Sequence, residues 1–217
     1  MPRAKREHAM LVVCVASSKG GSGKSTLAAA LAVRAAADGD CVVLDCDPQC
    51  SLLRWWDLRG KTDNPVVREP RGDLTKILPD LAKEGFDTCI IDTPPAPIDK
   101  IESAIKVADV VLIPAQASVL DVESVGATVE LARKHGRKFV FVLNRVEPRS
   151  KLTAEAEAYL QADGPVLSVR VKNRESYRAA MTDGRTGPEV RDESAKNEIN
   201  ELWLGVTNAA IVPEGER

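Results

Sequence analysis

The stretch Ser17-Ser18-Lys19-Gly20-Gly21-Ser22-Gly23-Lys24-Ser25-Thr26 decides the fold of this 217-residue chain. It follows a short apolar run, residues 10–16, and leads into an alanine-rich segment with a helical pattern. Its glycines let backbone N–H groups converge on phosphate oxygens, and a helix N-terminus adds favourable partial charge. We therefore predict a phosphate-binding loop, rather than a plain glycine-rich turn, in which Lys24 reaches the terminal phosphates and the Ser25 hydroxyl ligates Mg²⁺.

Outside this loop, short apolar runs alternate with amphipathic stretches. Continuously apolar strands are typical of a parallel sheet that is covered on both faces, and strand–helix alternation predicts right-handed crossovers. We predict an α/β fold with a doubly wound, mostly parallel sheet flanked by helices. The segment from Arg59 to Gly72 is interpreted as an irregular excursion. Strands are predicted at 10–16, 41–44, 86–91, 110–113, 138–143 and 166–169, and helices at 25–37, 74–84, 98–107, 120–135, 153–161, 176–181 and 190–210.

The composition is that of a globular chain, with 44% hydrophobic and 29% charged residues. No apolar run approaches the ~20 residues that span a bilayer. The five cysteines include no Cys-x-x-Cys, which favours a reduced cytosolic protein, and a metal site at Cys46 and Cys50 would have only His8 and His135 as further soft ligands. We expect one domain over residues 1–217, with a flexible basic N-terminus at 1–9 and no room for an added DNA-binding domain.

The order Lys-Gly-Gly-x-Gly-Lys-Ser-Thr departs from the common phosphate loop, because Ser18 takes the place of its first glycine and Lys19 follows. This order resembles the deviant Walker A signature of the ParA/MinD family of dimerising ATPases. The resemblance implies ATP or ADP with Mg²⁺ as cofactors, a homodimer in the ATP-bound state, and a Lys19 that crosses to the partner's nucleotide. A cation supplied there would stabilise charge that develops on the phosphates. The implied nucleotide-binding residues of the loop are Lys19, Gly20, Gly21, Ser22, Gly23, Lys24, Ser25 and Thr26.

Two acidic elements follow predicted strands. Asp45-Cys46-Asp47-Pro48-Gln49 resembles the family's Asp-x-Asp-Pro-Gln element, although alone it would read as a helix-capping turn. The match implies that Asp47 activates the attacking water and that Asp45 lies near the Mg²⁺ shell. Ile90-Ile91-Asp92-Thr93-Pro94-Pro95 is similar to the family's Walker B, which implies that Asp92 holds the Mg²⁺ shell, since hard oxygen ligands suit this ion. Lys19, Lys24 and Asp47 are thus the implied catalytic residues.

The stretch Asn144-Arg145-Val146-Glu147 leaves two bases open. The family resemblance implies an adenine contact by Asn144, whereas Asn-Lys-x-Asp is the guanine-recognition motif of GTPases. We favour ATP, because arginine and glutamate in place of lysine and aspartate would misplace a bidentate carboxylate. The segment from Pro114 to Asp121 resembles one that leads into an interface helix, so we expect it to contact the partner subunit.

The formal net charge of −2 hides an uneven distribution. Residues 133–151 hold seven basic residues and one acidic residue, while residues 186–217 hold seven acidic residues against three basic ones. A solvated charge run is one interpretation. Resemblance to partition ATPases implies the other, non-specific DNA binding by the ATP-bound dimer, which should weaken steeply with salt. The residues expected to bind DNA are Arg149, Lys151, Arg170, Lys172, Arg174 and Arg178, with Arg185 beside them.

Among its relatives the chain looks most like the small ParA type, the ParF-like proteins. This resemblance implies a weak, Mg²⁺-dependent ATP hydrolase that partitions or positions DNA or protein cargo. A ParB-like or cargo adaptor protein would stimulate it, and it would be cytoplasmic and nucleoid-associated. A MinD-like membrane helix is not expected, because the last thirty residues are acidic. The alternative is a MinD-like positioning or scaffold protein with little hydrolysis.

Overall fold

A computed structural model describes residues 9–95, 98–118, 123–147 and 152–211. The strands are β1 (Leu11–Val15), β2 (Cys41–Asp45), β3 (Val66–Arg68), β4 (Thr88–Asp92), β5 (Val110–Ala115), β6 (Lys138–Val146) and β7 (Val166–Lys172). The helices are α1 (Lys24–Ala36), α2 (Ser51–Leu58), α3 (Leu74–Glu84), α4 (Ile98–Val107), α6 (Gly126–Lys134), α7 (Leu152–Asp163), α8 (Glu175–Met181), the 3₁₀ turn η1 (Gly187–Glu189) and α9 (Glu193–Ile211).

One seven-stranded sheet forms the middle of the molecule, in the order β3-β2-β4-β1-β5-β6-β7. All of its strand pairs are parallel, so the predicted doubly wound α/β fold is confirmed. The strand β1 lies between β4 and β5, which is where the chain reverses the direction in which it adds strands. In such sheets ligands bind beyond the carboxyl ends of the strands at this reversal.

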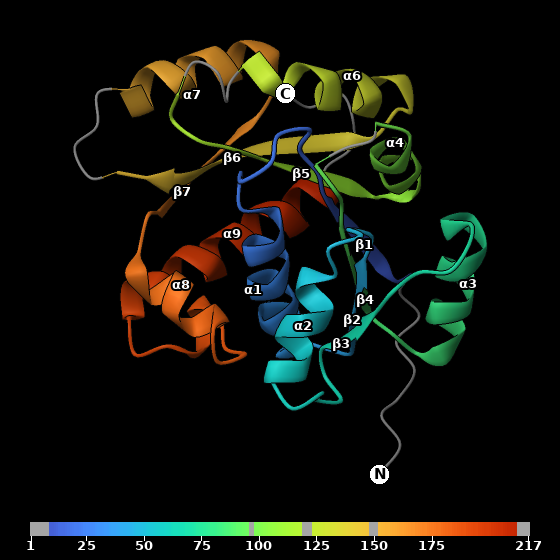
Figure 1. Ribbon diagram of the computed structural model, residues 1–217. Coiled ribbons are helices and arrows are strands. Elements are labelled where there is room, and N and C mark those ends of the chain that lie inside the picture. Colours follow the sequence, from blue (N-terminus) through green and yellow to red (C-terminus); the bar gives the residue numbers. More distant parts are fainter. Residues whose placement is uncertain (1–8, 96–97, 119–122, 148–151, 212–217) are drawn as a thin grey trace.

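Helices cover both faces of the sheet, as Figure 1 shows, with α1, α2 and α9 on one side and α3, α4, α6 and α7 on the other. Successive strand side chains point to opposite faces. In β1, Val13 and Val15 therefore join the core under α1 and α9, whereas Val12 and Cys14 join the core on the opposite face. Strands with two buried faces explain the continuously apolar runs in the sequence.

The segment from Arg59 to Gly72 is not wholly irregular, and this prediction was wrong. It contains β3, which forms the sheet edge and pairs with β2, Val66 opposite Val42. Three residues are too few to show a strand pattern, so the pairing is decided by the neighbouring strand. The helix α2 was also missed, because its eight residues bury only Leu52 and Trp55.

The other predicted elements are confirmed within a few residues at their ends, apart from the helix expected at 120–135. Residues 123–124 are helical, Val125 forms a turn, and α6 continues from Gly126, while residues 119–122 lie outside the described part of the chain. The expected flexible N-terminus also falls there, since residues 1–8 are not described. Within the described ranges, no helix is long and apolar enough to cross a membrane.

Candidate nucleotide site

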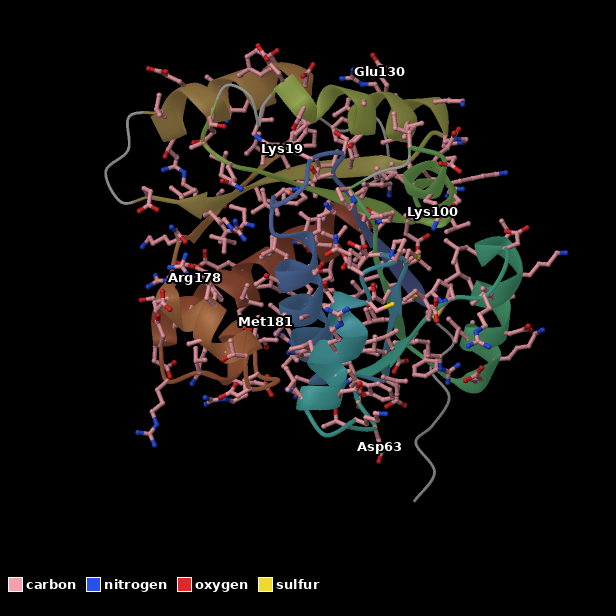
Figure 2. The ribbon with its side chains drawn as sticks, in the orientation of Figure 1. Lys19, Asp63, Lys100, Glu130, Arg178 and Met181 are labelled. Carbon is pink, nitrogen blue, oxygen red and sulfur yellow. The ribbon has the colours of Figure 1, made fainter. Side chains whose placement is uncertain are left out.

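The loop between β1 and α1 has the backbone of a phosphate cradle. Gly21 and Gly23 have φ values of 78° and 93°, in the left-handed region that favours glycine. Gly23 is needed for a second reason, because a Cβ atom there would lie 2.3 Å from Asn144 Nδ2. The Lys24 ammonium donates to the Lys19 carbonyl oxygen at 3.1 Å, and burial lowers the pKa of Lys24. Figure 2 labels Lys19 on this loop, near the start of α1.

Asp92 ends β4 beside this loop and is fully buried. Neither of its carboxylate oxygens has a hydrogen-bond partner within the described residues. Burial raises the pKa of Asp92 to about 7; the nearby Ser25 hydroxyl opposes this effect, the negative charge of Asp45 adds to it, and the Lys24 ammonium opposes it. A buried carboxylate without partners is costly unless a ligand supplies them. Together with the Ser25 hydroxyl, these hard oxygens fit the donor set that Mg²⁺ prefers.

Asp45 and Asp47 lie at the carboxyl end of β2 but have different surroundings. Asp45 is buried and accepts backbone N–H bonds from Leu52 at 2.9 Å and Leu53 at 3.1 Å, in the first turn of α2. Its oxygens thus anchor α2, and a place in the Mg²⁺ shell stays a prediction. Asp47 is half-buried, and its carboxylate accepts the Gln49 N–H at 2.9 Å, so it remains partly accessible to water.

A third contact with the loop comes from the segment after β5. Gln116 Nε2 donates to the Gly21 carbonyl oxygen at 3.0 Å, and Ser18 Oγ donates to the Ser124 carbonyl oxygen at 2.7 Å. This segment is predicted to contact the partner subunit, but its contact with the loop was not predicted. No local pattern could show it, because Gln116 and Gly21 are 95 residues apart. Residues 119–121 of that segment lie outside the described part.

Asn144, the predicted adenine contact, lies on the opposite side of the loop. Asn144 is nearly buried at the end of β6; its Nδ2 donates to the Ser22 carbonyl oxygen at 2.7 Å, and its Oδ1 accepts the Arg145 N–H at 2.9 Å. Arg145 has a φ of 54°, an unusual value for a residue with a side chain. Beside them lies a cavity of about 40 Å³. Its walls come from α1, β6, β7, α8 and α9, through Gly23, Thr26, Leu27, Ala30, Asn144, Arg145, Val171, Lys172, Asn173, Arg174, Tyr177, Arg178 and Ile199.

A family model described as the CobQ/CobB/MinD/ParA nucleotide binding domain matches residues 13–186. The chain belongs to this family. The resemblance to the ParA/MinD family is thereby confirmed, whereas the roles of the individual loop residues stay predictions. The match spans the elements from the phosphate loop to the end of α8, whereas α9 lies beyond it.

Relatives of known name agree with this assignment. The chain is 32% identical over 202 residues to the Maintenance of carboxysome distribution protein A of Halothiobacillus neapolitanus, which covers 88% of this chain and 93% of that protein. The ATP complex of McdA from Cyanothece has a similar fold, with a TM-score of 0.70, 21% identity, and coverage of 96% and 99%. A plasmid partition protein from Borrelia burgdorferi also has a similar fold, with a TM-score of 0.68 and 19% identity; the match covers 93% of this chain and 100% of that protein.

The basic residues of this ParA/MinD-type domain are paired with acids to an extent that charge counting missed. Arg170 binds Glu157 on α7, Arg178 binds Glu175 at 2.7 Å, and Arg185 binds Asp183 at 2.6 Å. These partners come from other elements or from the same turn, so a count along the chain overstates the free positive charge. Arg149 and Lys151 lie outside the described residues, and the DNA-binding role of the whole set stays a prediction.

Two further members of the basic set lie at the cavity. Arg174 donates to Glu198 on α9 at 2.6 Å, and its side chain is only 20% exposed. The Lys172 ammonium is 4.0 Å from the same carboxylate, but its side chain is 52% exposed. Arg174 and Arg178 both line the cavity. The Arg174 side chain is largely covered, whereas that of Arg178, labelled on α8 in Figure 2, is 62% exposed.

Proposed function

We propose that this chain is an ATP-dependent molecular switch that pairs with a second copy when ATP is bound and positions a cellular cargo. The observation that carries the proposal is the unpartnered, buried carboxylate of Asp92 beside the Lys24 ammonium and the glycine-rich loop. A buried carboxylate of this kind gains a partner when a ligand brings in a cation such as Mg²⁺. A protein assembly is the cargo that we favour, because the relative from Halothiobacillus neapolitanus is named for carboxysome distribution.

Hydrolysis would use residues that already lie around the loop. Backbone N–H groups from Gly20 to Ser25 would bind the phosphates, and Lys24 would exchange the Lys19 carbonyl for a terminal phosphate oxygen. Asp47 would orient a water by accepting a hydrogen bond from it. The water oxygen would then bond to the γ-phosphorus and its proton would pass to the Asp47 carboxylate, while the bond to the bridging oxygen breaks and ADP leaves with that electron pair. Mg²⁺, held through Ser25 and Asp92, would neutralise phosphate charge.

Dimerisation would complete this site. In our proposal Lys19 reaches the partner's nucleotide, where its ammonium offsets charge in a place that excludes water. We therefore expect Lys19→Ala to bind MgATP as the wild type does, to remain monomeric, and to lose hydrolysis by about 1,000-fold. Light scattering and turnover measurements test this, with Lys76→Ala, an exposed lysine on α3, as the control. A Lys19→Ala protein that dimerises and turns over normally would leave only a simple nucleotide-binding enzyme.

Binding to DNA would follow from pairing. A single subunit offers few uncompensated charges, but two copies double them on one surface, and backbone binding is driven by summed charge. We expect non-specific DNA binding at low salt only with ATP and Mg²⁺, which would hold the protein on the nucleoid. Fluorescence anisotropy of a labelled duplex, with ATP, ADP or no nucleotide, tests this expectation. Equal binding in all three states would contradict it.

A cargo adaptor or ParB-like protein would then stimulate hydrolysis and release. Comparing ATP and GTP turnover, with and without DNA, tests the base assignment and the enzymatic role together. Faster turnover of GTP would overturn the assignment of ATP. Tight ATP binding with no turnover under any of these conditions would favour a MinD-like scaffold.

A further inference from the structure

Glu198 on α9 binds residues that form one wall of the cavity beside Asn144, where the proposed function would place the base, although Glu198 does not line the cavity itself. Its Oε2 accepts the Lys172 backbone N–H at 3.2 Å and the Tyr177 hydroxyl at 2.9 Å. Its Oε1 accepts Arg174 Nη2 at 2.6 Å, and both oxygens lie 3.2 Å from Arg174 Nε. One nearly buried carboxylate thus holds three residues that do line the cavity, two on the strand end and one on α8.

The remaining contacts of this wall show that Glu198 holds its centre. At one end, Asn173 donates its backbone N–H to the Val146 carbonyl oxygen at 3.1 Å. At the other end, Asp192 accepts Arg174 Nη1 at 3.4 Å, a long contact compared with the 2.6 Å bond to Glu198. Without the Glu198 charge, the Arg174 guanidinium would lose its strongest acceptor, and the wall would be held only by the pairing of Lys172 with Val146 and by the Tyr177 bond to the Ala195 carbonyl oxygen at 3.1 Å.

The same contacts determine which hydrogen-bonding groups the wall offers. The adjacent N–H groups of Lys172 and Asn173 are both engaged, by Glu198 and by the Val146 carbonyl. Adenine presents an amino donor where guanine presents the O6 acceptor. With these two donors occupied, the wall has less to offer guanine O6. A site whose donors are already satisfied discriminates against the base that needs them.

We propose that Glu198 is a positioning residue of the base pocket: it fixes the Lys172–Tyr177 wall, carries the base-dependent part of nucleotide affinity, and favours adenine over guanine by occupying the Lys172 N–H. This inference rests on the proposed nucleotide function of the site. In this proposal, different parts of the protein bind the two parts of the nucleotide. The phosphates depend on the loop before α1, and the base depends on α9, which lies at the far end of the sequence.

The test uses the full chain and three probes, MgATP, MgGTP and magnesium tripolyphosphate, which has phosphates but no base. Dissociation constants are measured by calorimetry for the wild type, Glu198→Gln, Glu198→Ala and Glu201→Gln. Glu201 is the matched control, because it is an exposed glutamate one turn further along α9. We expect Glu198→Gln, which removes the charge that holds Arg174, to weaken ATP binding about tenfold and to leave tripolyphosphate binding within about twofold. Glu198→Ala, which also frees the Lys172 N–H, should in addition lower the preference for ATP over GTP.

Other outcomes overturn the inference. Unchanged ATP affinity, or an equal loss for ATP and tripolyphosphate, would mean that Glu198 does not act through the base. If Glu198→Gln does not fold, Tyr177→Phe removes one of the same contacts, and the same split between ATP and tripolyphosphate is required of it. If the wild type binds GTP more tightly than ATP, the proposed ATP function and the adenine preference fail together, and the positioning role is judged on GTP against tripolyphosphate. A wild type that binds tripolyphosphate as tightly as ATP overturns the inference alone, and one that binds none of the three overturns both proposals.

Discussion

Two buried carboxylates lie on either side of the glycine-rich loop, and they differ in what surrounds them. Asp92, at the end of β4, is fully buried and has no hydrogen-bond partner within the described residues. Glu198, on α9, is almost as buried but accepts bonds from Lys172, Arg174 and Tyr177. Burial alone therefore says little about the role of an acidic residue, and its partners decide the matter.

This difference shows that the carboxylate without hydrogen-bond partners lies on the phosphate side of the site. The phosphate side leaves Asp92 unsatisfied at a cost to stability, which is the arrangement expected of a group that waits for a ligand. The base side satisfies Glu198 completely and so forms a fixed wall. Burial raises the pKa of Asp92, and burial together with Glu198 raises that of Tyr177, so both side chains avoid charge that no neighbour compensates.

The largest effect is expected at the unpartnered acid. Asp92→Asn should lower ATP turnover about 1,000-fold, because a ligand of the bound ion is lost. The same change should stabilise the nucleotide-free protein by about 1–2 kcal/mol, because a buried carboxylate without partners is removed. Single-turnover hydrolysis and chemical denaturation measure the two effects, with Asp99→Asn, an exposed acid on α4, as the control. A variant that loses both activity and stability would show that Asp92 has partners after all.

The reverse result is expected on the base side. Arg174→Ala should destabilise the protein by about 3 kcal/mol, because it breaks a nearly buried ion pair and leaves Glu198 charged without its main partner. Denaturant titration measures this. If stability falls by less than about 1 kcal/mol, then Glu198 is held by its other contacts and the comparison with Asp92 weakens.

A smaller effect should follow from a single hydroxyl. Tyr177→Phe removes donation to Glu198 at 2.9 Å and to the Ala195 carbonyl oxygen at 3.1 Å. The ring remains packed, so the expected loss is about 1 kcal/mol, the usual contribution of a buried hydrogen bond. Thermal denaturation of the nucleotide-free protein measures it. The control substitution Tyr159→Phe, at an exposed ring on α7, should not change the stability.

The smallest effect is expected at the surface pairs. Arg178→Ala should change stability by less than about 0.5 kcal/mol, because its pair with Glu175 is solvated. Its effect should appear in DNA binding instead. The double variant Arg170→Ala and Arg178→Ala should fold normally but lose about two phosphate contacts. The slope of log affinity against log salt concentration should then become shallower by about 2. An unchanged slope would assign these arginines to the ordinary solvated surface.

The phosphate side could be read from the sequence because its parts are contiguous. The glycines, Lys24 and the following helix fall within one short stretch, and Asp47 and Asp92 each follow an apolar strand directly. The sheet could be predicted for the same reason, since strands buried on both faces leave continuous apolar runs. The weak edge strand β3 escaped prediction, because its three residues gain their pairing only from β2.

The base side depended on tertiary structure. Nothing in the local sequence of Glu198 indicates that it reaches β7, 26 residues away at Lys172, or that Arg174 is neutralised there instead of exposed. The requirement for glycine at position 23 likewise comes partly from Asn144, which approaches it from β6. Sequence alone indicated a nucleotide-binding fold, because backbone geometry and phosphate chemistry act locally. The cavity wall beside Asn144 was decided only by folding, because hydrogen bonds and charge compensation act between groups that the chain order keeps apart.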